Sequence, residues 1–199
     1  MAAQKNSKAP KKQGPDWRWI FTIFFITVLI SAVMSLISTN LLSSATLGVS
    51  FVILICIIAI GIVFDIIGVA VTAADEKPFH SMASRKVPEA TQALKLIRNA
   101  GRVSSFCNDV IGDICGVVSG AAAATIAAEI LAAFQWSAQT LVSLGMSALV
   151  AGLTVGGKAL GKSAAMNSCT AIVFAAGKVI HWLKCVPKLL PAKGRKNNR

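Results

Sequence analysis

A run of 46 residues, from 19 to 64, contains no charged side chain. A membrane-spanning helix needs about 20 apolar residues, so this run is long enough for two spans joined by a turn. The polar segment from Ser38 to Ser50 is the expected turn. The first apolar stretch is longer than the roughly 7–15 residues of a signal-peptide core, which favours a true span over a cleaved signal.

Composition extends this prediction to the whole chain. Hydrophobic residues make up 55% of the 199 residues and charged residues only 14%, which is outside the range of soluble domains. Two further apolar segments, 103–131 and 137–160, follow a polar stretch. We therefore expect an all-α integral membrane bundle with four transmembrane helices, a cytoplasmic helical insert and a C-terminal interfacial helix.

Basic residues predict the orientation of the bundle. The 20 Lys and Arg residues precede the first expected span, lie between the second and third, or begin at Lys158, and none lies in the two short loops of the opposite side. Cytoplasmic loops collect Lys and Arg, so both termini of this multi-pass protein should be cytoplasmic, with the chain in the cell membrane. The net charge of +12 could suggest nucleic-acid binding. Basic tails beside membrane spans are better explained by anionic lipid headgroups, so no nucleic-acid partner is expected.

These patterns divide the chain into segments. We expect a basic tail at 1–16, a first transmembrane helix at 17–38, a membrane core at 46–162 with a cytoplasmic insert at 74–102, an interfacial amphipathic helix at 163–187 and a basic tail at 188–199. In the insert, Pro78 and Pro88 favour helix starts. After Pro88, apolar residues recur at helical spacing until about Gly101, which predicts a short amphipathic helix.

Several charged residues fall within the expected spans: Asp65, Asp109, Asp113, Glu129 and Lys158. A charged residue at the centre of a membrane helix costs at least about 2.5–3.5 kcal/mol, so each needs water, an ion or a partner. Asp109 and Asp113 lie four residues apart and hence on one helix face. Their depth matches that of Lys158 on the next span, which predicts an ion pair between Lys158 and these two acids. Pairing of the acids with Arg102 at the cytoplasmic end is the alternative.

The same segment carries Gly112, Gly116 and Gly120. This doubled small-xxx-small spacing allows another helix to approach closely, either within the chain or from a second copy.

Two short motifs are ALKLIRN, Ala93 to Asn99, and GKALGK, Gly157 to Lys162. The first resembles the end of the cytoplasmic insert in the transmembrane module of the CNNM/CorC type of magnesium transporter, and the second resembles that family's Gly-Glu-x-x-Pro-Lys run. The resemblance covers Ile53 to about Trp182, with residues 1–45 as an added first span. It implies a homodimer and a dehydrated Mg²⁺ ion bound by Asn108, Asp109 and Asp113, with Asp65 near the family's serine-rich site.

The chain departs from the family at the proposed metal site, because Lys158 and Gly161 replace the family's Glu and Pro. The CBS domains that usually follow are also expected to be missing. Mg²⁺ prefers oxygen ligands, and an ammonium group repels it. Two hypotheses follow: a degenerate, non-transporting or regulatory relative with an intramembrane Lys–Asp ion pair, or a Mg²⁺ transporter or exporter with an acidic site.

Other chemistry has little support in the sequence. The five cysteines are scattered singly, without the paired spacing of a zinc site. His80 and His181 lie on different segments, and no catalytic spacing is evident. We expect neither an enzyme nor a cofactor, apart from Mg²⁺ under the transport hypothesis.

Overall fold

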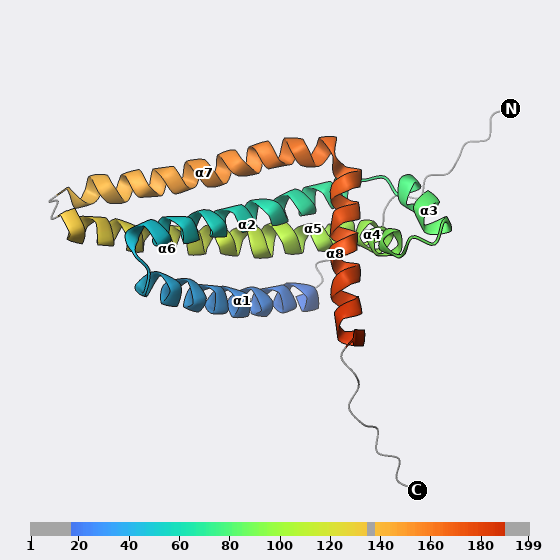
Figure 1. Cartoon of the computed structure of the whole chain (residues 1–199), viewed down its shortest axis with the longest axis horizontal. Coiled ribbons are helices and arrows are strands. Elements are labelled where there is room, and N and C mark those ends of the chain that lie inside the picture. Colours follow the sequence, from blue (N-terminus) through green and yellow to red (C-terminus); the bar gives the residue numbers. More distant parts are fainter. Residues whose placement is uncertain (1–16, 135–137, 190–199) are drawn as a thin grey trace, which may run out of the picture.

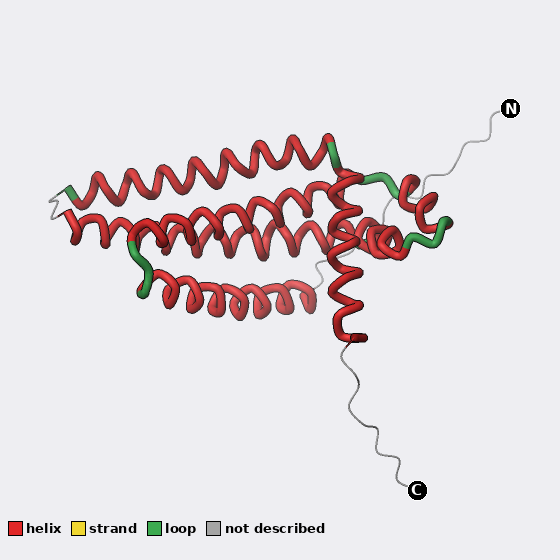
Figure 2. The backbone as a smooth tube through the Cα atoms, viewed as in Figure 1, coloured by secondary structure: helices red, strands yellow, loops and turns green. Residues whose placement is uncertain are grey.

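The computed structural model describes residues 17–134 and 138–189, and every regular element in these ranges is helical. Helix α1 spans Trp17–Ser43, α2 spans Leu47–Ala73 and α7 spans Gln139–Asn167. The remaining long rod consists of α5 (Ala100–Ser105), the π-helix η1 (Phe106–Gly112) and α6 (Asp113–Phe134), which follow one another without a break. Figure 1 shows these rods side by side, and Figure 2 shows the short connections between them.

Four helical segments of the described ranges are long and apolar enough to cross a membrane: Ile20–Ser43, Leu47–Ala73, Ala100–Phe134 and Gln139–Asn167. The expected all-α membrane bundle of four spans is therefore confirmed. Helix α2 is the central element, because it contacts α7, α6, η1, α5 and α8.

The ends of α1 and α7 differ from the predicted ones. Helix α1 continues through the polar segment to Ser43, so the turn comprises only residues 44–46. Ser43 Oγ donates a hydrogen bond to the carbonyl of Asn40, 3.0 Å away, and such local bonds let hydroxyl side chains remain inside a helix. Likewise α7 extends to Asn167, beyond the predicted end of the core at 162.

The insert folds as two short helices, α3 (Lys77–Ser84) and α4 (Pro88–Arg98), each with a proline in its first turn. The predicted amphipathic helix after Pro88 is confirmed, since Ala90, Ala93 and Leu94 are buried. It ends at Arg98, three residues before the expected Gly101, and α5 begins directly after Asn99.

Helix α8 (Cys169–Leu189) runs across the end of the bundle instead of along it (Figure 1). The chain turns at Ser168, so this helix begins later than the predicted 163. It packs against α4 and α2, with Val173 fully buried. The end of the bundle that carries α3, α4 and α8 is called the α8 end below.

Candidate functional site

An ion pair joins α7 to α2 inside the bundle. Lys158 Nζ lies 3.7 Å from Asp65 Oδ1, and the two side chains are 28% and 17% exposed. Asp65 precedes the end of α2 by eight residues, and Lys158 precedes the end of α7 by nine. At 1.5 Å per residue both therefore lie about 12–14 Å from the α8 end, well within their spans.

Two glycines lie near this pair. A Cβ atom at Gly112 would lie 3.5 Å from Lys158 Nζ and 3.6 Å from Asp65 Oδ1, so η1 approaches the pair with bare backbone. On α7, a Cβ at Gly161 would lie 2.7 Å from Cγ1 of Ile66, which is too close for an alanine without movement. The absence of a side chain at Gly161 thus lets α7 approach α2 closely beside the ion pair.

Asn108 lies on the same side of the third rod. Its Nδ2 donates to Ser104 Oγ at 3.3 Å, whereas its Oδ1 is buried and has no hydrogen-bond partner among the described residues. Oδ1 faces Gly68 of α2, where a side chain would overlap with it. Asn108 belongs to η1, and π-helical turns occur frequently at functional sites. The apolar pattern of the sequence could not indicate this π-helical turn, because the search for helices assumes 3.6 residues per turn throughout.

The recess next to the pair is narrow. Gly61 of α2, Gly116 of α6 and Thr154 of α7 border it together with Lys158, and it has essentially no volume open to a water-sized molecule. The Thr154 hydroxyl is buried, and none of the described residues hydrogen-bonds to it. The polar groups here are therefore packed by protein, with no room for a hydrated cation in this conformation.

The predicted pairing of Lys158 with Asp109 and Asp113 is wrong. Both acids are exposed on the outside of the third rod, and Lys158 instead pairs with Asp65. Their four-residue spacing places them on one face, as expected, but the spacing cannot say which way that face points. The inner face is occupied by Asn108 and Gly112, which pack against α2 and the ion pair.

The residues predicted to bind Mg²⁺ do not converge. The amide oxygen of Asn108 is buried against α2, whereas Asp109 and Asp113 are exposed. In residues 17–134 and 138–189, no group of three or more His, Cys, Asp or Glu side chains is placed to hold a metal ion. Of the predicted ligands, the structure packs Asn108 against α2 but leaves the two acids exposed.

The predicted glycine face is divided between two environments. Gly112 is buried, and Gly116 is half-buried beside the internal recess, where a Cβ atom would meet no described atom within 4 Å. Gly120 is exposed, and a Cβ atom there would meet no described atom within 4 Å. Gly120 is thus the exposed member of these three glycines.

Comparisons of the chain with protein-family models, curated proteins and solved structures give no match. Its function is therefore inferred from the membrane helices, from the ion pair of Asp65 with Lys158 and from the buried Asn108 side chain.

Proposed function

We propose that this chain is a non-transporting, scaffold-type or regulatory relative of the CNNM/CorC transmembrane module. In this proposal the Lys158 ammonium group takes the place of the transported metal ion and holds α7 against α2. The observation that carries the proposal is the contact of Lys158 Nζ with Asp65 Oδ1 at 3.7 Å.

Charge balance supports this role. A lysine buried in a span is costly unless it has a counter-charge, and Asp65 provides one at similar depth. The recess beside Lys158 is closed to water, so the position is occupied by protein atoms instead of by a hydrated ion. A permanent ammonium group at this place would also repel an arriving divalent cation.

The proposed topology has both termini and the α8 end in the cytoplasm. The distribution of the 20 Lys and Arg residues supports it, because residues of the insert and of the segment from Lys158 onward belong to that end. The cell membrane is the proposed location, and self-association as a homodimer is carried over from the resemblance.

Divalent cation transport is the second candidate function. Its support is the buried Asn108 Oδ1 without a hydrogen-bond partner among the described residues, a free oxygen ligand on a π-helical turn. Together with the Asp65 carboxylate it would offer two oxygen ligands if Lys158 moved away.

A double-mutant cycle tests the scaffold role. Lys158→Met leaves Asp65 without its counter-charge and should cost about 3–5 kcal/mol of stability, whereas Lys158→Met with Asp65→Asn should restore most of the loss. Thermal unfolding of the purified protein in one detergent measures both. Lys162→Met, one turn further on the exposed side of α7, is the matched control and should change stability little. A Lys158→Met variant as stable as the control would refute the scaffold role.

Mg²⁺ titration separates the two functions. The scaffold role predicts that Mg²⁺ leaves the unfolding temperature of the wild type unchanged relative to matched ionic strength. The transport role predicts a Mg²⁺-dependent rise in the wild type and in Lys158→Glu, which restores the family's residue, and loss of that rise in Asn108→Ala.

A further inference from the structure

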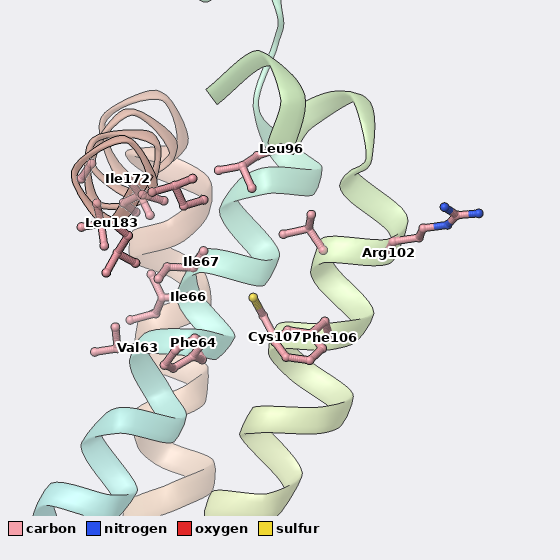
Figure 3. A pocket seen from close by; sticks show the side chains of 15 residues that line it. Val63, Phe64, Ile66, Ile67, Leu96, Arg102, Phe106, Cys107, Ile172 and Leu183 are labelled. Atoms are coloured by element: carbon pink, nitrogen blue, oxygen red, sulfur yellow. The ribbon is translucent and has the colours of Figure 1, made fainter. Parts of the chain in front are cut away.

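A large apolar cavity lies at the α8 end, separate from the ion pair. Its volume is about 770 Å³, within the range of about 300–1,000 Å³ of ligand pockets. It is formed by α2, by the α5–η1 rod and by the lower face of α8, with Leu96 of α4 above it (Figure 3). Every side chain that lines it is apolar except Arg102.

The cavity is open to the outside of the bundle. Val63 of α2 is 51% exposed, Phe106 of η1 is 39% exposed and Leu183 of α8 is 56% exposed, although all three line the cavity. Water is a poor occupant, because an ordered water needs two to four polar partners. A hydrocarbon chain can make apolar contacts with these walls without leaving a polar group unpaired.

Helix α8 indicates the level at which the cavity lies in the membrane. Its apolar residues, such as Ala176 and Leu183, face the cavity, whereas Lys178 is exposed elsewhere on the helix. An amphipathic helix across the end of a membrane bundle lies at the boundary of headgroups and acyl chains. The cavity beneath it is therefore at the level where the acyl chains of phospholipids begin.

The charges around the cavity favour an anionic headgroup. Arg102 borders the cavity, and its guanidinium group extends away from the apolar side chains (Figure 3). Helix α8, which covers the cavity, carries Lys178 and Lys184 and contains no acidic residue. Basic pockets between membrane helices on the cytoplasmic side bind anionic lipid headgroups.

We propose that this cavity is a binding site for an anionic phospholipid, with an acyl chain under α8 and the phosphate near Arg102. The lipid would fill the space between α8 and the spans and so fix α8 against the bundle. The site does not involve Asp65, Asn108 or Lys158, so the lipid proposal does not depend on the proposed scaffold role.

Native mass spectrometry of the purified full-length chain tests the proposal. Phosphatidylglycerol and phosphatidylcholine with identical acyl chains are titrated separately, and the dissociation constant of the first bound lipid is measured. Phosphatidylglycerol should bind more tightly. Arg102→Gln should weaken it about fivefold, as expected for roughly 1 kcal/mol per basic residue near the membrane surface. Arg85→Gln, in the insert away from the cavity, should not.

A second pair of variants tests the acyl-chain site. Ala176→Phe fills the cavity and should weaken phosphatidylglycerol at least about tenfold, which corresponds to 1.4 kcal/mol. Ala171→Phe makes the same change on an exposed position of α8 that does not line the cavity, and should leave binding unchanged. Leu183→Trp, at the exposed part of the cavity, replaces Ala176→Phe if that variant fails to fold.

Three outcomes would overturn the proposal. Equal affinity for the two lipids would remove the headgroup site, and equal effects of Ala176→Phe and Ala171→Phe would remove the acyl-chain site. A change in the dimer population of Ala176→Phe without a change in lipid affinity would assign the cavity to a second copy of the chain.

Discussion

Glycines on α7 and α8 that look equivalent in the sequence have different surroundings in the fold. A Cβ atom at Gly177 of α8 would lie 2.8 Å from the carbonyl oxygen of Glu89 and 3.1 Å from the amide nitrogen of Ala93, both backbone atoms of α4. Backbone in a helix cannot yield as a flexible side chain does. At Gly156 of α7, no described atom lies within 4 Å of the added Cβ.

This difference predicts opposite effects of the same substitution. Gly177→Ala should push α8 away from α4 and destabilise the protein by about 1–3 kcal/mol, the usual cost of overpacking. Gly156→Ala is the matched control and should stabilise by about 0.5–1 kcal/mol, because alanine loses less backbone entropy in a helix. Thermal unfolding in one detergent measures both changes. Equal stability of the two variants would contradict the close contact of α8 with α4.

At the scale of elements, the two ends of the helices should lie in different compartments. Ser84 at the end of α3 and Thr140 at the start of α7 are both exposed, at opposite ends of the bundle. In a background in which the five native cysteines are replaced, an impermeant maleimide added to intact cells should modify Thr140→Cys. It should modify Ser84→Cys only after permeabilisation, because the Lys and Arg residues cluster at the α8 end.

The reverse labelling pattern would place the α8 end outside the cell. It would leave the helical fold untouched but would overturn the proposed cytoplasmic termini.

At the scale of the whole molecule, α1 is the least integrated span. In the most apolar 18-residue window of this span no residue is buried. In the corresponding window of the third span, 44% of the residues are buried. Its contacts are with α6, α2 and η1 on one side only. Hydrophobic association between helices is weak in lipid, so few packed side chains mean a weak attachment.

Cleavage of the connection between α1 and α2 should therefore leave the remaining bundle folded. A protease site introduced into the turn at residues 44–46, cut in the purified protein, should change the unfolding temperature of α2–α8 little. The uncut variant is the control. Loss of cooperative unfolding after cleavage would show that α1 belongs to the core of the fold.

Self-association should depend on the outer face of α6. Gly120 is exposed, whereas Gly112 is buried and Gly116 is half-buried beside the internal recess. Gly120→Leu should lower the crosslinked dimer fraction in membranes, because a large side chain prevents close approach of a second helix. Gly145→Leu changes an equally open glycine of α7 and should have no effect. A dimer fraction that responds to neither variant would place any interface elsewhere.

The sequence by itself determined the class of the protein, its four spans and the amphipathic character of α4 and α8. These features depend on local quantities: the length of an apolar run, the periodicity of side chains after Pro88 and the positions of Lys and Arg. Each acts within one helix, so it is readable without knowledge of the neighbours. The boundaries at Ser43 and Asn167 were less readable, because serines and small residues are compatible with both a turn and a continued helix.

Only the tertiary structure decided which acid faces Lys158. Depth along the helix made Asp109 and Asp113 as suitable as Asp65, and their spacing made them a more conspicuous pair. The rotation of each helix about its own axis made the choice, and that rotation follows from packing between helices: Gly112 against the ion pair, Gly161 against Ile66, and Asn108 against Gly68. The π-helical turn of η1 further changes the phase between α5 and α6. Such contacts join residues far apart in the chain, which is why no local pattern contains them.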